Sequence, residues 1–129
     1  MTWDRTKCVD ALVPVLAAAN PAVNVLDHPP MTVTPPFIEV HRPTLVTYAN
    51  AGFGVDTAEL PILIGSGLEQ EDAIEAMKNA CRSALLANPT LGGAVAGCHP
   101  AQERNWRNQP AGAGGIQLLT VELVIEVLM

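Results

Sequence analysis

One helix between residues 68 and 88 constrains this chain more than any other feature of the sequence. Apolar side chains recur there at three- and four-residue spacing, which is typical of a helix that packs one face on a core. The stripe consists of Ile74, Met77, Cys81, Ala84 and Leu85. Carboxylates within 69–72 suit the positive end of the helix dipole. Pro89 marks the other end, because the residue before a proline avoids the α conformation.

Strands are predicted on both sides of this helix. The segment from Leu60 to Ile64 alternates in the way of a strand with one buried face. A Gly-Ser-Gly turn follows at 65–67, and we expect Ser66 to cap the helix. A glycine turn at 91–93 then leads into another strand. Residues 57–99 are therefore expected to form a strand, a tight turn, a helix, a glycine turn and a strand.

A second helix is predicted from Asp4 to Ala19, before Pro21. Its apolar stripe consists of Val9, Leu12, Val13 and Leu16. Pro14 lies inside it, and a proline there removes one hydrogen bond and clashes with the carbonyl of Asp10. We expect a kink at this point or a helix in two pieces.

The remaining sequence predicts three further extended segments and two loops. Short strands are expected at 23–26 and 37–42, within a region that six prolines interrupt. Residues 44–56 lack a sustained period and indicate a loop, although part of it could pair as a strand. The polar segment 101–115 indicates a long loop. The segment 118–128 alternates regularly and indicates the longest strand, with one core face and one wet face.

These elements predict one α+β domain over residues 1–129. It has two layers, with the two main helices on one face of a mostly antiparallel sheet of four or five strands. The length and the 49% hydrophobic content suit one moderate core. No segment has the pattern of a membrane span or a secretory signal, and we expect a soluble protein made inside the cell. The formal charge of −6 disfavours a broad nucleic-acid interface.

No group of residues carries a convincing catalytic, cofactor or metal signature. Cys98-His99 near Glu103 could suggest a nucleophile and a base, but adjacent strand residues point to opposite faces. The three cysteines form no CxxC pair and are expected to be buried free thiols. The three histidines lack metal-ligand spacing. The turn at 65–67 lacks the third glycine of a dinucleotide fingerprint, and the nearby carboxylates repel anions.

A tryptophan between two cations is the best candidate for a partner contact. Trp106 lies between Arg104 and Arg107 in the predicted loop. An aromatic residue with flanking charges in a loop is typical of an interface anchor, and we expect Glu103 to Gly115 to become ordered on a partner. The alternative is a tryptophan that folds back onto its own domain.

The order of the elements resembles that of the tail terminator proteins of long-tailed bacteriophages. The resemblance spans nearly the whole chain and includes the strand ending Ile62-Leu63-Ile64-Gly65, the Leu91-Gly92-Gly93-x-Val95 turn and the closing Val/Glu-alternating strand at 120–127. Pro14 in the first helix departs from the pattern. The resemblance implies a virion protein, made in the host cytoplasm, that forms a homohexameric ring on the finished tail tube and stops polymerisation. Its partners would be the tail tube protein and the head connector or a neck protein.

Four glutamates raise a question about the lumen of such a ring. If the predicted registers hold, Glu39, Glu59, Glu122 and Glu126 project from one sheet face, where His41 is the only group that could be cationic. One interpretation is a solvated surface. The sharper one is that this acidic face lines the hole of the ring, through which DNA passes without specific binding, because carboxylates repel phosphates.

Three other interpretations remain open at this point. Another neck protein, such as a head-completion or stopper protein, would share the small size and the ring assembly. An enzyme acting through Cys98 would need a depressed thiol pKa and a nearby base. A small-ligand-binding domain would need a deep pocket, for which the sequence gives no argument.

Overall fold

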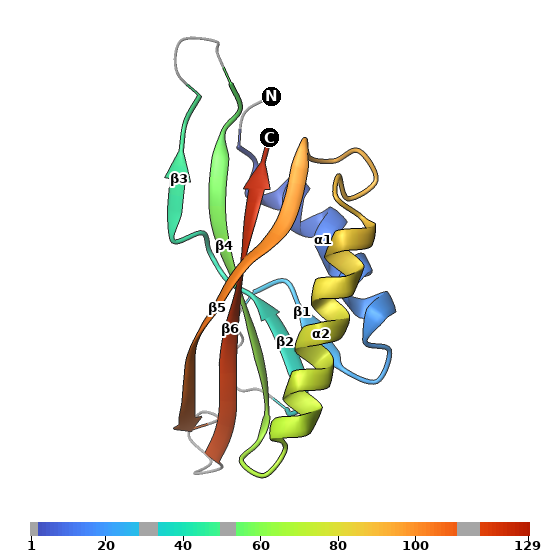
Figure 1. Ribbon diagram of the computed structural model, residues 1–129, viewed down its shortest axis with the longest axis vertical. Helices are drawn as coiled ribbons and strands as arrows, with labels where there is room; N and C mark the ends of the chain where they lie inside the picture. Colours follow the sequence, from blue (N-terminus) through green and yellow to red (C-terminus); the bar gives the residue numbers. More distant parts are fainter. Residues whose placement is uncertain (1–2, 29–33, 50–53, 111–116) are drawn as a thin grey trace.

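The computed structural model describes residues 3–28, 34–49, 54–110 and 117–129 (Figure 1). Two helices and six strands follow one another in this part of the chain. In order, they are α1 (Arg5–Ala19), β1 (Asn24–Leu26), β2 (Phe37–Val40), β3 (Leu45–Thr47), β4 (Thr57–Gly67), α2 (Glu71–Ala87), β5 (Gly97–Pro110) and β6 (Gln117–Leu128). Neither of these helices is long and apolar enough to cross a membrane.

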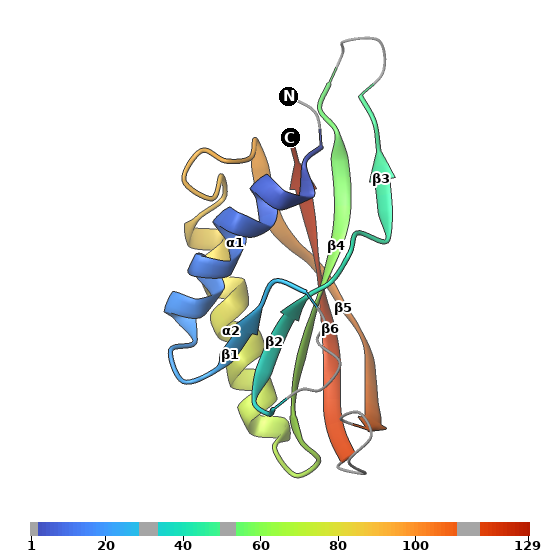
Figure 2. The same ribbon diagram turned by 180° about the vertical axis from the view of Figure 1, so that it is seen from behind.

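The strands form one sheet in the order β1-β2-β4-β6-β5, and β3 pairs with β4 beyond the end of β2. β1 and β2 are parallel, and every other pair is antiparallel. Both helices cover the same face of the sheet (Figures 1 and 2). The predicted α+β class, with a mostly antiparallel sheet, is confirmed. The sheet has six strands rather than four or five, because residues 45–47 of the predicted loop pair with β4.

The main core lies between the helices and the sheet. The helix stripes supply Leu12, Leu16, Ile74 and Leu85, all fully buried. They pack with strand residues in one cluster, whose sheet members include Ile38, Val40, Leu60, Ile62, Ile64, Val121, Leu123, Ile125 and Val127. Each fully buried side chain of this size stabilises the fold by roughly 2 kcal/mol. The predicted apolar stripes therefore define the helix layer.

The two helices differ in how their N-termini are capped. The Asp4 side chain accepts a hydrogen bond from the Lys7 amide at 3.1 Å and caps α1. Gln70 is the N-cap of α2 and makes no side-chain cap bond. The expectation that Ser66 caps α2 is wrong, because β4 continues through Gly67 and places Ser66 inside the strand, 7% exposed. The acidic first turn of α2 complements the helix dipole instead.

Pro14 does not divide the first helix. α1 runs without a break from Arg5 to Ala19, and Pro14 lies on its exposed side. An exposed proline leaves the carbonyl four residues earlier accessible to water, which lowers the cost of the lost hydrogen bond. The expectation of two helical pieces is therefore wrong.

The predicted loop at 101–115 is a strand over most of its length. β5 extends to Pro110 and pairs with β6 almost throughout, while residues 111–116 lie outside the described part. β5 ends the sheet order, and an edge strand can be polar because one side of it faces solvent. The polar composition of residues 101–115 therefore led to the wrong prediction of a loop.

The sheet face opposite the helices is less wet than predicted. It holds a second small cluster formed by Phe37, Leu63 and Leu118. Gly65 is required beneath it, because a Cβ there would lie 2.5 Å from Cζ of Phe37. Thr120 is also fully buried. The expected division of the last strand into one core face and one wet face is correct for its helix side and wrong for part of the other.

Candidate functional site

The face of the sheet that points away from the helices, here called the outer face, carries the four glutamates singled out from the sequence. Residues opposite each other on paired strands project from the same face. Glu39 and Glu122 both pair with Leu63. Glu59 pairs directly with Glu126, four residues further along each of the two strands. The register thus puts all of these carboxylates on one face.

Most of this charge is offset on the same chain. Glu39 is only 3% exposed, and its Oε1 lies 3.2 Å from Nε2 of His41. Glu126 lies 3.6 Å from Nε2 of His99. The expectation that His41 is the only offsetting group is wrong, because His99 and two arginines share the face. The outer face is a mixed-charge surface rather than a purely acidic one.

A bulge in β5 turns both arginines toward one carboxylate. Arg104 pairs with Glu122 and Arg107 with Thr120, so β5 carries one extra residue in this interval. Asn105 adopts a positive φ of 59°, which asparagine tolerates, and donates a hydrogen bond to Glu122. Oε2 of Glu122 lies 3.9 Å from Nε of Arg104 and 3.7 Å from Nη2 of Arg107. We call these four residues, Arg104, Asn105, Arg107 and Glu122, the outer-face cluster.

Trp106 projects to the other side of β5, toward α2. Its Nε1 donates to Oε2 of Glu103 at 2.8 Å, and Nζ of Lys78 lies 5.8 Å from the centre of its ring. Lys78 also donates to Glu103 at 2.9 Å and to Glu75 at 2.7 Å. We call Glu75, Lys78, Glu103 and Trp106 the helix-side cluster. The structure therefore separates the tryptophan from the two arginines, and the ring folds back onto its own domain while remaining 37% exposed.

Lys78 is the buried charge that sequence reasoning missed. It is only 4% exposed, and burial opposes its charged form, but the hydrogen bonds that it donates to Glu75 and Glu103 outweigh burial and raise its pKa. The hydrogen bond from Lys78 and then that from Trp106 lower the pKa of Glu103. Burial raises this pKa, but its effect is smaller. The available signal was position, because Lys78 falls four residues after Ile74 on the apolar stripe.

The three cysteines are buried free thiols, as predicted. Burial raises the pKa of Cys8 and of Cys81 to about 11, and that of Cys98 to about 12. Cys98 packs in the main core, whereas His99 points outward to Glu126. A thiol with a raised pKa is a poor nucleophile, so this pair does not form a catalytic dyad.

β3 and β4 form a hairpin that extends beyond the rest of the sheet (Figures 1 and 2). Three of its large apolar side chains are exposed: Leu45 at 54%, Tyr48 at 73% and Val55 at 39%. Asp56 fixes its base, because Oδ1 accepts from the Ala49 amide at 2.7 Å and Oδ2 from the Trp3 amide at 2.6 Å. These two bonds lower the pKa of Asp56. The hairpin is thus an anchored arm with an apolar surface.

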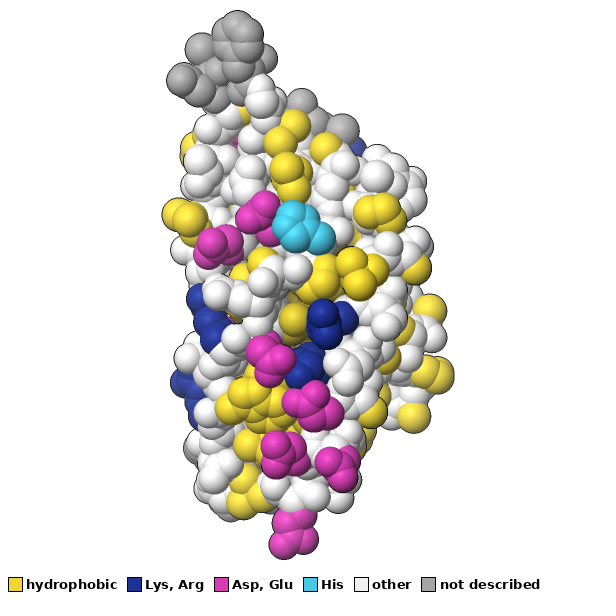
Figure 3. All heavy atoms as spheres, in the orientation of Figure 1, with side chains coloured by type: hydrophobic (Ala, Val, Ile, Leu, Met, Phe, Trp, Pro, Cys, Tyr) yellow, Lys and Arg dark blue, Asp and Glu magenta, His cyan; other side chains and the backbone are white. Residues whose placement is uncertain are grey.

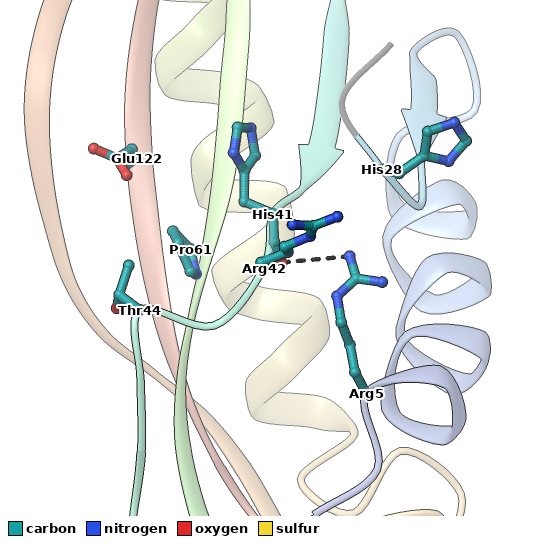
Figure 4. A pocket seen from close by; sticks show the side chains of 7 residues that line it. All are labelled: Arg5, His28, His41, Arg42, Thr44, Pro61 and Glu122. Carbon is teal, nitrogen blue, oxygen red and sulfur yellow. Dashed lines mark hydrogen bonds between the residues drawn. The ribbon is translucent and has the colours of Figure 1, made fainter.

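A hollow of about 630 Å³ opens where the chain leaves β2 (Figure 4). Arg5 reaches it from the start of α1, and its Nη2 donates to the carbonyls of Asp27 and Val40 at 2.9 and 3.2 Å. The lining residues are Arg5, His28, His41, Arg42, Thr44, Pro61 and Glu122. Most of its charged side chains are cationic or can become so, which is unusual in a chain of net charge −6. Sequence reasoning missed this site because its residues come from five separate segments.

Within residues 3–28, 34–49, 54–110 and 117–129, no group of three or more His, Cys, Asp or Glu side chains could hold a metal ion. The surfaces that the structure offers are instead suited to contact: the apolar hairpin arm, the mixed-charge outer face and the cationic hollow.

Comparison with known proteins gives a likeness of fold. No protein-family model matches the chain, and no curated protein matches it by sequence. Among solved structures, the chain is similar to a chain of a structure described as the virion of a native gene transfer agent particle. The TM-score is 0.63 and the identity 17%, and the match covers 93% of this chain and 90% of the other. At this identity, the likeness establishes a shared fold over nearly the full length of both chains.

Proposed function

We propose that this protein is a structural component of a phage-like virion, and that it forms the ring that caps a completed tail tube. The observation that carries the proposal is the full-length fold likeness to a virion chain. The sequence resemblance to tail terminators supports the same role independently of the coordinates. In this role the ring stops tail polymerisation and joins the tail to the head connector or a neck protein.

The surfaces described above suit a protein that works by contact. The arm formed by β3 and β4 presents Leu45, Tyr48 and Val55 to solvent, and exposed apolar side chains gathered on one projection are typical of a docking site. We assign the arm to contact with the tail tube or the connector. Arg104, Trp106 and Arg107 remain proposed partner contacts, with Trp106 acting from the α2 side and the arginines from the outer face.

The outer face, apart from the hollow beside β2, is our proposed lining for the hole of the ring. Glu39 is buried beside His41 and Glu122 pairs with two arginines, so repulsion of DNA would come mainly from Glu59 and from Glu126, which is 39% exposed beside His99. Replacing both with lysine should make the lining attract phosphates through counterion release. Particles carrying Glu59→Lys with Glu126→Lys should then eject DNA more slowly at low salt. Normal ejection at every salt concentration would place these residues away from the DNA path.

Electron microscopy of the purified protein, alone and mixed with tail tubes, tests the main proposal. We expect rings on one end of tubes of uniform length, and tubes of uncontrolled length without the protein. Binding to filled heads but not to tubes would instead support a head-completion or stopper protein. A strict monomer that binds neither structure would contradict both roles.

A further inference from the structure

The turn between β4 and α2 forms a projecting acidic surface. Glu69, Glu71 and Asp72 are all exposed there, and Leu68 among them is 43% exposed. We call residues 68–72 the acidic tip. Acidic side chains gather over the start of α2 in Figure 3. The lysine or arginine nearest to the tip in the sequence is Lys78, which donates hydrogen bonds to Glu75 and Glu103 instead.

The hollow beside β2 has the opposite character. Arg42 is exposed and has no hydrogen-bond or ion-pair partner among the described residues. Arg5 is held by backbone carbonyls, so its position is fixed, and Figure 4 shows it directed toward the same space as Arg42. His28 and His41 can also become cationic, but His28 lies beside Asp27 and His41 beside Glu39. Glu122 and the buried Pro61 complete the lining, so the two guanidinium groups supply the positive charge that a partner would meet.

The tip and the hollow match in charge. The hollow presents two guanidinium groups, that of Arg5 held in place by backbone carbonyls and that of Arg42 without a partner among the described residues. Guanidinium groups recognise carboxylates well, so the carboxylates of the tip suit this site.

The tip cannot enter the hollow of its own chain. Pro61 and Gly67 both lie in β4, which is a continuous paired strand between them. Six residues of strand span about 20 Å, so the tip lies far from its own hollow. A complementary pair of surfaces on one rigid unit can be satisfied only by another molecule.

We propose that the acidic tip of one copy of this chain seats in the cationic hollow of the next. This inference rests on the ring proposed above and names the contact that would build it. Such a contact is heterologous, because two different surfaces meet in it. Repeated from copy to copy, it forms a ring if the rotation between neighbouring copies closes. A contact held by charge weakens as salt is raised.

Charge reversal tests this contact directly. Sedimentation velocity over a wide concentration range should show self-association of the wild-type protein that weakens with salt. Arg42→Glu should weaken association about tenfold or more, and Glu71→Lys should do the same, because each leaves charges unpaired at the contact. The double variant Arg42→Glu with Glu71→Lys should recover most of the association, since the pair is restored with its signs exchanged.

Arg82→Glu is the matched control, because Arg82 is exposed on α2 outside both surfaces. It makes the same charge change as Arg42→Glu and should leave association unchanged. Thermal unfolding of each variant checks that the fold is kept. A monomeric wild-type protein at all concentrations, a double variant that stays as weak as the single ones, or an equal loss in Arg82→Glu would each overturn the contact.

Tail binding separates this inference from the proposed function. If wild-type protein caps tail tubes and Arg42→Glu associates and caps normally, the ring exists but uses another contact. If wild-type protein associates in the expected way but caps no tubes, the contact stands and the tail role fails. The hollow could instead bind an acidic segment of another protein. If it does so and Glu71→Lys leaves self-association unchanged, a second copy is not the occupant.

Discussion

The two faces of β5 carry charge clusters of similar composition in different environments. In the helix-side cluster, Lys78 is 4% exposed and its ammonium donates hydrogen bonds of 2.7 and 2.9 Å. In the outer-face cluster, the guanidinium nitrogens of Arg104 and Arg107 lie 3.9 and 3.7 Å from Glu122. Burial and geometry, rather than the number of charges, distinguish the two.

The difference indicates which cluster serves the fold and which serves the surface. A buried cation that loses a partner cannot recover full hydration, so its partners are required for stability. Long ion pairs at an accessible surface contribute little, because water and salt compete with them. We therefore expect the helix-side cluster to hold β5 on α2 and the outer-face cluster to remain available for contact.

Removing Glu103 should have the largest effect on this comparison. Glu103→Ala takes one partner from Lys78 and one from Trp106, and should lower the free energy of unfolding by about 2 kcal/mol. The expected loss of stability is smaller than for a fully buried ion pair because the Glu103 side chain is 43% exposed. Denaturant titration measures it.

Glu122→Ala is the control for that measurement. It should cost less than about 1 kcal/mol, and the cost should shrink further at high salt, because its ion pairs with Arg104 and Arg107 are 3.9 and 3.7 Å long, although the Glu122 side chain is only 19% exposed. Equal losses in the two variants would show that the faces of β5 do not differ in this way.

Trp106→Ala should have the next largest effect, lowering the free energy of unfolding by about 1 to 2 kcal/mol through lost burial and the lost contact with Lys78. Trp106→Phe keeps the ring and removes only the indole N–H, so its cost should be smaller. Tail binding by the same variants separates the two roles of this residue. If Trp106→Ala keeps full stability but loses binding, the ring is an anchor rather than a support for α2.

Acid should weaken the helix-side cluster in a defined direction. The pKa of Glu103 is lowered in the folded protein, so its contribution is present above the unfolded pKa, about 4, and is lost as pH falls through the folded pKa. Asp56 has a lowered pKa and adds to the same trend. Unfolding free energy should therefore fall on acidification below about pH 4. Glu103→Gln should flatten the slope, and an unchanged slope would contradict this origin.

The smallest predicted effect is stabilising. Glu59 and Glu126 are direct cross-strand partners of like charge, and among the described residues Glu59 has no ion-pair partner. Glu59→Lys replaces repulsion with attraction and should raise the unfolding free energy by about 0.5 kcal/mol. Glu59→Gln should give roughly half of that gain. A loss of stability in Glu59→Lys would show that the two side chains do not approach each other.

The sequence predicted well where one local rule decided the outcome. The stripes of α1 and α2, the helix-side positions of β4 and β6 and the burial of the cysteines all follow from the spacing of apolar residues along one element. The sequence predicted poorly where pairing with another strand decided the secondary structure. Residues 101–110 are polar, yet they form most of β5 because β6 satisfies their backbone groups.

The candidate site shows the same division. The sequence by itself determined that Glu59, Glu122 and Glu126 are polar positions of alternating strands. Only the tertiary structure decided that a bulge at Asn105 turns two arginines toward Glu122 and sends Trp106 to the opposite side. A single inserted residue reverses the facing of every following side chain relative to a regular strand, and nothing in the residue types alone records where that insertion falls.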